Sequence, residues 1–286
     1  MYKRLYEIYN DCFNFCLDHE DEFNDFLKKS GSQQRIRKSR LELCELLLIQ
    51  IWFPFSKYKD FKSYYKYYVL REFKDCFFLV SYPQVVKLMN KTPFLLKMFL
   101  NQKLEKGGKY FLIDSTSLSV CHPSRAGNNK VFSNKANFGY STMEQKFYGF
   151  KLHLTINNHG EIANYMIAKA NHHDVKFANK LSHGLKGYLC GDKGYISSAV
   201  GRKLAKKGVK LLTQTRRTMK YRNIFHGKEK YLITHRSIIE SVFNKMKNVL
   251  GMVIHRSRNF AGFLVHSLSA LIAYTFDKKK PSIAIS

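Results

Sequence analysis

The spacing of apolar residues changes near residue 106, and this change limits the folds that the chain can adopt. Residues 1–106 contain one glycine and three prolines, and their apolar side chains recur every three or four positions, as in amphipathic helices. From residue 109, short apolar runs alternate with glycine turns and helical segments, which is typical of strands alternating with helices. We therefore predict an all-helical N-terminal domain, residues 1–106, followed by an α/β domain, residues 107–286.

The same patterns predict individual elements. In the first domain we expect helices near residues 2–29, 38–53, 58–79 and 83–103, with breaks at Pro54 and Pro83. In the second we expect strands near 109–114, 148–157, 161–168, 187–192 and 209–214, and helices near 174–185, 196–207, 235–250 and 260–276. Three early strands followed by alternating helices and strands are consistent with an RNase-H-like mixed sheet flanked by helices. Periodicity alone does not fix the strand order.

The charge of the chain indicates its partner. Forty-nine Lys and Arg residues against 21 Asp and Glu give a formal net charge of +28, which favours a polyanionic partner such as nucleic acid or an anionic membrane surface. The most apolar stretches, residues 43–53 and 262–276, are shorter than the roughly 20 residues that a membrane span needs. The N-terminus also lacks the apolar core of a secretory leader. We therefore expect a cytoplasmic, nucleoid-associated protein that binds DNA.

Two kinds of basic segment are candidates for DNA contacts. The stretch QQRIRKSR at residues 33–40 carries four cations, and residues 56–68 interleave lysine with tyrosine. Phosphate binding is the natural use of such faces, although a solvated basic surface explains them equally well. We take the following as DNA-binding candidates: Arg35, Arg37, Lys38, Arg40 and Arg125, the last in the long insertion between the first two strands.

Two aspartates occupy matching positions after apolar runs. Asp114 ends KYFLID, which predicts a central strand, and small polar residues follow it. Asp192 ends GYLCGD and lies between Gly191 and Gly194, which allow the backbone to turn sharply beside a ligand. Ligand sites in open α/β sheets gather beyond the carboxyl ends of strands. Either aspartate alone could merely cap a turn, but the repeated arrangement favours a site.

A third carboxylate lies on a predicted helix. In residues 235–250, Arg236, Glu240 and Lys247 fall in one narrow sector beside the apolar face. We expect Arg236 and Lys247 to bind DNA by neutralising phosphate on the substrate strand. The alternative is a surface ion pair between Arg236 and Glu240, which contributes only a few tenths of a kcal/mol.

Polar residues on the strand near 148–157 are further candidates. Lys151 and His153 alternate with leucines, so both should face one side of the strand, towards DNA or the site. His172, His173 and Asp174 also form a cluster, but we expect Asp174 to be a helix N-cap and exclude the cluster from any metal site.

The motifs together resemble the DDE transposases of bacterial insertion sequences, most closely the insertion-sequence 982 group. The similar segments are FLIDSTSLSVC (111–121), NFGYS (137–141), FYGFKLHLTINNHGEI (147–162), GDKGY (191–195) and the Arg236-x3-Glu240-x6-Lys247 signature. The resemblance implies an RNase-H-like catalytic domain in which Asp114, Asp192 and Glu240 form the catalytic, metal-binding triad.

The activity implied is cleavage and strand transfer of DNA at the ends of an insertion sequence. Such chemistry uses two Mg²⁺ ions, with Mn²⁺ as the expected substitute, and oxygen ligands suit both ions. We expect terminal inverted repeats and target DNA as partners, and at least a homodimer, because two DNA ends are paired. A metal-dependent nuclease of the same fold, or a DNA-binding protein without catalysis, remains the alternative.

Overall fold

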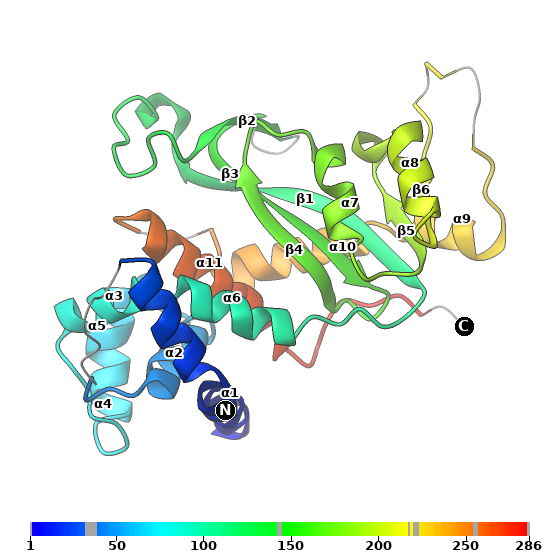
Figure 1. Ribbon diagram of the computed structural model, residues 1–286. Coiled ribbons are helices and arrows are strands. Elements are labelled where there is room, and N and C mark those ends of the chain that lie inside the picture. The colour runs from blue at the N-terminus through cyan, green and yellow to red at the C-terminus, as the bar shows by residue number, and fades with distance from the viewer. Residues whose placement is uncertain are drawn as a thin grey trace. The chain divides into compact units, whose positions relative to one another are not determined.

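The structure is a computed structural model that describes residues 2–31, 39–141, 145–216, 218–219, 223–253 and 257–284. The chain forms two units (Figure 1). The first comprises Met1–Lys103 and Met246–Asp277, and the second comprises Leu104–Lys245 and Lys278–Ser286. The sequence placed helix 260–276 in the second domain, whereas by its contacts it groups with the N-terminal helices.

The first unit is helical. Its α-helices are α1 (Tyr2–Lys29), α2 (Leu43–Trp52), α3 (Phe61–Tyr64), α4 (Leu70–Glu72), α5 (Tyr82–Met89), α6 (Pro93–Gln102) and α11 (Phe260–Thr275). A 3-10 helix η1 (Phe53–Ser56) and a π-helical turn η2 (Tyr65–Val69) connect some of them. The π-helical turn η6 (Lys245–Val249) begins at the last residue of the segment 104–245 and continues into the first unit. α2 and α11 are apolar around most of their circumference and pack against each other, and α11 also packs against α6. These two helices form the core of the unit because each has buried neighbours on most sides.

The second unit is built on a six-stranded mixed sheet. Its strands are β1 (Tyr110–Cys121), β2 (Asn137–Ser141), β3 (Gln145–Asn157), β4 (Ile162–Lys169), β5 (Gly187–Gly191) and β6 (Val209–Thr213). The strand order is β2-β3-β1-β5-β6, and β4 pairs with β3 on the edge that β2 also uses. β3 runs antiparallel to β1, β2 and β4, while β5 and β6 continue the sheet parallel to β1. The predicted mixed sheet flanked by helices is confirmed.

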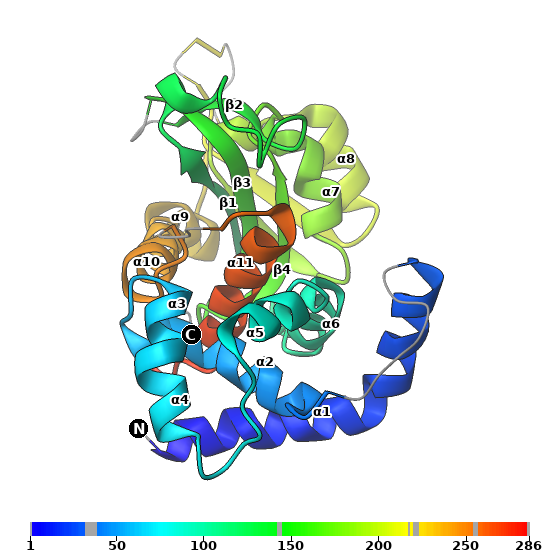
Figure 2. The same cartoon turned by 90° about the vertical axis from the view of Figure 1, so that its left-hand side faces the viewer.

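Helices cover both faces of this sheet. α7 (Ala178–Leu181) and α8 (Ser198–Ala205) pack on one face, where Phe111 and Ile113 of β1 belong to the buried core. α9 (Gly227–Thr234) and α10 (Ile238–Asn244) pack on the other, against β5, β6 and β1 (Figure 2). Since side chains alternate along a strand, Leu112 and Asp114 point towards the face of α9 and α10. Short 3-10 helices η3 (Pro123–Arg125), η4 (Asp174–Phe177) and η5 (Lys193–Tyr195) complete the unit.

Several predicted elements differ from those observed. The expected helix 83–103 is two helices, because Pro93 starts α6 and lacks the amide that would continue α5. The expected helix 174–185 is reduced to η4 and α7, and β2 and α9 were not predicted. The strand expected over 109–114 continues to Cys121, so Asp114 lies within β1 and not at its end.

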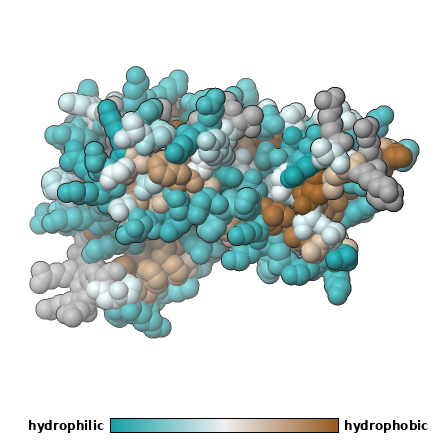
Figure 3. Space-filling model, turned by 90° about the horizontal axis from the view of Figure 1, so that it is seen from above, coloured by the Kyte–Doolittle hydropathy of each residue, from teal (hydrophilic) through white to brown (hydrophobic). Residues whose placement is uncertain are grey.

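One face of the molecule shows how polar and apolar residues are distributed on the surface. The face in Figure 3 is largely hydrophilic, with apolar side chains confined to separate patches. No helix in the described ranges has the length and apolar character needed to cross a membrane.

Candidate active site

The two aspartates lie side by side where β1 and β5 separate. The strands pair in parallel from Tyr110 opposite Tyr188 to Ile113 opposite Gly191, and the next residues are Asp114 and Asp192. β5 ends there, while β1 continues in antiparallel pairing with β3 alone. Since paired strands lie about 4.8 Å apart, the register brings the two residues together at the carboxyl end of β5. The two aspartates that the sequence singled out after apolar runs are therefore neighbours in the sheet.

Backbone amides hold both carboxylates in place. The Asp114 Oδ1 atom accepts a hydrogen bond of 2.7 Å from the backbone amide of Ser115. Asp192 is the N-cap of η5, and its Oδ1 accepts a 2.7 Å hydrogen bond from the amide of Gly194. A Cβ atom on Gly194 would lie 2.9 Å from that oxygen, so glycine permits the close approach. The GDKG segment therefore fixes the orientation of the Asp192 side chain.

Negative charge at the site exceeds what the neighbouring cation offsets. Burial, with smaller contributions from the charges of Asp192 and Asp174, raises the pKa of Asp114 to about 7 against the opposing effects of the Ser115 amide and Arg236. Burial also raises the pKa of Tyr195, and the same three aspartates contribute. The buried Tyr195 hydroxyl has no hydrogen-bond partner among the described residues. A bound cation would stabilise the ionised form of Asp114 in this setting.

Arg236 lies beside the aspartates. It occupies the turn between α9 and α10, and its charge lowers the pKa of both Asp114 on β1 and Cys190 on β5. Its side chain is half-buried, and no ion pair joins it to Glu240 in the part of the chain that the structure describes. The surface ion pair considered from the sequence is therefore not formed.

Glu240 is less closely associated with the aspartates. It lies on α10, which packs against β1, but its side chain is exposed. Within the described ranges, no three His, Cys, Asp or Glu side chains converge closely enough to hold a metal ion. The structure thus brings Asp114 and Asp192 of the predicted triad together, while Glu240 lies on the neighbouring helix α10.

Lys247 does not follow the predicted helical stripe. The expected helix 235–250 consists of a turn, the short α10 and the π-helical turn η6, which contains Lys247. A π-helical turn contains one more residue than an α-helical turn, so positions within it fall out of phase with α-helical spacing. The alignment of Arg236, Glu240 and Lys247 assumed one continuous α-helix, and that assumption is wrong.

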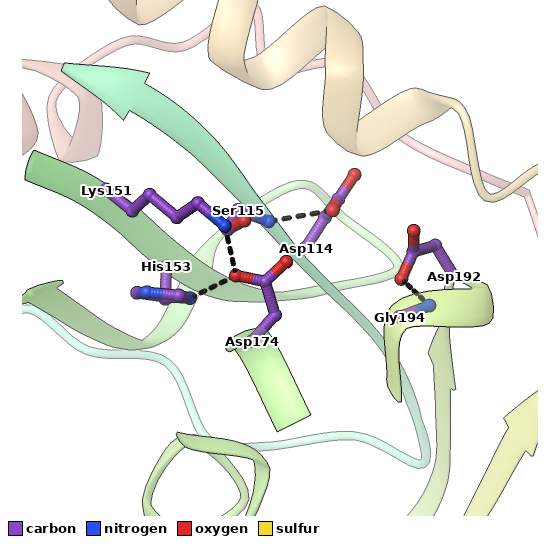
Figure 4. Close-up of polar contacts among 7 residues, drawn as sticks. All are labelled: Asp114, Ser115, Lys151, His153, Asp174, Asp192 and Gly194. Atoms are coloured by element: carbon purple, nitrogen blue, oxygen red, sulfur yellow. Dashed lines mark hydrogen bonds and ion pairs between the residues drawn. The ribbon is translucent and has the colours of Figure 1, made fainter. Parts of the chain in front are cut away.

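Lys151 and His153 share one strand face, as expected, but it is opposite to that of Asp114. Asp114 pairs with Leu154, whereas His153 pairs with Ser115. Lys151 Nζ lies 3.0 Å and His153 Nδ1 lies 3.7 Å from the Asp174 Oδ1 atom. In Figure 4 both side chains point towards Asp174, while Asp114 points away from it.

His153 has no exposed surface, so in this conformation its ring does not reach a DNA-accessible surface as predicted. Burial lowers the pKa of His153 to about 4, so the contact with Asp174 joins a neutral ring to a carboxylate at neutral pH.

Asp174 has a different role in the structure from the one predicted from the sequence. It is the first residue of η4, and the N-cap position belongs to His173, so the predicted N-cap role is wrong by one residue. Its carboxylate instead binds Lys151 and raises the pKa of Asp114. The sequence pointed to this partner of Lys151 only indirectly. Lys151 and His153 were expected on one strand face, and two basic side chains on one face favour a carboxylate beside them.

The remaining DNA-binding candidates are distributed over both units. Arg40 and Arg125 are exposed. Arg35, Arg37 and Lys38 lie outside the described residues.

Comparison with known proteins gives one family. A family model described as "Transposase DDE domain" matches residues 105–260, which is more than half of the chain and includes all three predicted triad positions. A search of curated proteins finds no match.

Among solved structures, the chain is similar to the cryo-EM structure of a piggyBac transposase synaptic complex with hairpin DNA. The sequence identity is 12%, the TM-score is 0.38, and the match covers 61% of this chain and 41% of that one. The chain therefore spans less than half the length of this structural relative, and the likeness carries no functional argument by itself.

Proposed function

The chain belongs to the Transposase DDE domain family, and on this basis we propose that it cuts and joins DNA at the ends of an insertion sequence, with the help of divalent metal ions. The motifs favour the insertion-sequence 982 group within the family. The strand arrangement, four strands joined in antiparallel pairs followed by two strands parallel to β1, supports the RNase-H-like fold that this proposal requires.

One observation carries the proposal. Asp114 and Asp192 are the residues that follow the last paired positions of β1 and β5, so two carboxylates meet at the carboxyl end of a parallel strand pair. Sheets of this kind bind their ligands at such positions. Both segments lie within the matched family region.

The residues fit a hard divalent cation in part. Carboxylate oxygens are the ligands that Mg²⁺ prefers, and the raised pKa of Asp114 marks a buried carboxylate whose charge a cation would stabilise. Asp114 and Asp192 would hold the metal, and Glu240 would complete the ligand set from α10. When bound, two such ions activate the attacking oxygen and stabilise the leaving oxygen of a phosphodiester.

The protein's own groups orient the substrate. The amides of Ser115 and Gly194 fix the two carboxylates before substrate arrives. The Arg236 guanidinium, half-buried beside Asp114, would form charge-assisted hydrogen bonds to the phosphate of the strand being cut. Positive charge elsewhere on the chain would bind the flanking DNA without regard to sequence.

A cleavage and joining assay tests the proposal. The purified protein is incubated with Mg²⁺, a target plasmid and a duplex that carries the repeats flanking its gene, and a duplex with scrambled ends serves as control. We expect strand breaks at the repeat ends and joined products, both abolished by EDTA. Metal-dependent breaks without joining would indicate a nuclease, and binding without breaks would indicate a DNA-binding protein that lacks catalysis.

A further inference from the structure

Helix α1 differs from the rest of the chain in charge and in exposed apolar surface. It carries seven of the 21 acidic residues of the protein but only four basic ones, although the entire chain has a net charge of +28. Five of its large apolar side chains are also exposed. Phe26 (37% exposed) stacks on Phe94, and the other four are Tyr2 (76%), Tyr6 (68%), Phe13 (41%) and Leu17 (69%). An acidic helix is a poor surface for DNA, so this face needs another partner.

These four residues form one narrow stripe. At 100° per residue, positions 2, 6, 13 and 17 span about 60° of the helix circumference. The opposite side of α1 buries Ile8, Cys12, Phe15 and Cys16 in the first unit. The stripe therefore lies on the outer face of a helix whose inner face is already packed. Exposed aromatic and aliphatic residues in such a row are typical of protein interfaces.

We propose that the stripe, Tyr2, Tyr6, Phe13 and Leu17, binds the same stripe of a second copy of the chain in antiparallel orientation. The spacing is symmetric about the midpoint between residues 9 and 10. An antiparallel pair therefore sets Tyr2 opposite Leu17 of the second copy and Tyr6 opposite its Phe13. A two-fold axis requires this reciprocity, in which residue i contacts j and j contacts i.

The charges along α1 select the antiparallel orientation. Exposed Lys3 lies near one end of the stripe, and the exposed acidic residues Glu20 and Asp21 lie just beyond the other end on the same side of the helix. Antiparallel pairing places the basic end of each helix beside the acidic segment of the other and also opposes the two helix dipoles. Parallel pairing would set the two acidic segments against each other, which is unfavourable.

This interface deepens the proposed function, which requires two DNA ends to be paired, but it does not depend on catalysis. A helix pair of this length is smaller than a standard interface, so we expect reversible association in about the micromolar range. The tests below contain no DNA and no metal. Their failure would therefore leave the catalytic proposal standing, and failure of the catalytic proposal would leave this one intact.

Sedimentation equilibrium of the full chain tests the stripe. The wild-type protein should form dimers, and Tyr6→Glu should weaken the association at least about tenfold, because it places a charge at the centre of the apolar contact. The matched control is Phe78→Glu, which changes a 75% exposed aromatic residue outside α1 and should leave association unchanged. A monomeric wild type, or equal weakening by both variants, would overturn the proposal.

Cross-linking tests the orientation. In a background with Cys76 and Cys121 changed to serine, Tyr2→Cys and Leu17→Cys chains are treated with a short bis-maleimide, separately and as a mixture. Only the mixture should give cross-linked dimers, since identical positions lie about 22 Å apart in the antiparallel pair at 1.5 Å per residue. Cross-linking of either variant alone would indicate parallel pairing, and no cross-linking in the mixture would exclude the interface.

Discussion

The Asp114 side chain is buried beside other carboxylates. Its contribution to the free energy of unfolding should therefore depend on pH. Its pKa rises from 3.8 to about 7 on folding, so the folded state holds this proton more tightly than the unfolded state. The contribution of the protonated Asp114 carboxyl to the free energy of unfolding is fully present below pH 3.8 and is lost as the pH rises towards 7. Above that pH the ionised carboxylate destabilises the folded protein.

Asp114→Asn should therefore stabilise the metal-free protein at high pH. The amide stays neutral, so the melting temperature of the variant should match that of the wild type near pH 4. At pH 8 in EDTA it should exceed the wild-type value by at least about 3 °C. Scanning calorimetry across this range measures the difference. An equal or lower melting temperature of the variant at pH 8 would show that the carboxylate is already stabilised without a cation.

Arg236 gives a second prediction for a single side chain. Because it has no ion pair with Glu240 among the described residues, Arg236→Ala should change the melting temperature little at pH 5, where Asp114 is protonated. The single-turnover cleavage rate should fall at least tenfold, about 1.4 kcal/mol of barrier, since the phosphate contact is lost. Arg236→Lys should restore only part of the rate because an ammonium lacks the bidentate geometry. Full activity in Arg236→Ala would show that the arginine has no role in cleavage.

Individual site residues were predictable to different extents. The apolar runs before Asp114 and Asp192 identify strands, and a carboxylate directly after such a run is visible in the sequence. The alternation around Lys151 and His153 correctly predicts a shared face. That this face is opposite to the face of Asp114 follows from the β1–β3 register, in which Asp114 pairs with Leu154. The sequence of one strand does not specify this register. The position of Asp174 depends on the same register.

The β1–β3 strand pair should be sensitive to substitution at Gly149. A Cβ atom on Gly149 would lie 2.2 Å from the backbone oxygen of Leu118, close to the irregularity between Ser119 and Cys121. Gly149→Ala should thus cost about 2 kcal/mol or more, because backbone must move to relieve the overlap. Gly201→Ala is the control: it lies in α8 with open space around it and should stabilise by about 0.5–1 kcal/mol. Urea unfolding measures both, and a neutral Gly149→Ala would contradict the described β1–β3 contact.

Elements were predictable where the local pattern was long and uninterrupted. The bounds of α1 agree with those expected, and α11 and β4 differ from expectation by a residue at most at each end. The helix around Glu240 was not predictable in this detail, because α10 passes into the π-helical turn η6 without any proline or glycine to indicate it. Apolar spacing alone does not separate a continuous helix from one with an inserted residue.

Across the entire chain, the segments that make up the first unit determine how DNA binding should be tested. Deleting residues 1–106 would remove α2 and α6, the helices against which α11 packs, and would expose an apolar helix. Truncation is therefore unsuitable, and substitution within residues 33–40 is the better experiment. The packing of α11 against α6 was not predictable from the sequence, because the sheet-containing segment 104–245 lies between these two helices along the chain.

Binding through the segment at residues 33–40 should be electrostatic. Changing Arg35, Arg37, Lys38 and Arg40 to glutamine should flatten the slope of log K against log salt by about 0.9 for each cation that contacts a phosphate. A matched control changes four exposed cations around α7 and α8, namely Lys180, Arg202, Lys203 and Lys206. A larger flattening in the control would place the main DNA surface in the second unit.

The pairing of Asp114 with Asp192 is tested by nicking of end-containing DNA with Mg²⁺, using wild-type protein, Asp192→Asn and the control Asp25→Asn. Asp25 lies on α1, where it forms an exposed ion pair with Lys28. Asp192→Asn should lose nicking by at least about a thousandfold, because a metal ligand is removed. Its DNA affinity should stay equal or rise slightly, since a negative charge facing phosphate is lost, and Asp25→Asn should behave as wild type. Wild-type nicking by Asp192→Asn would contradict the assignment of this strand end as the active site.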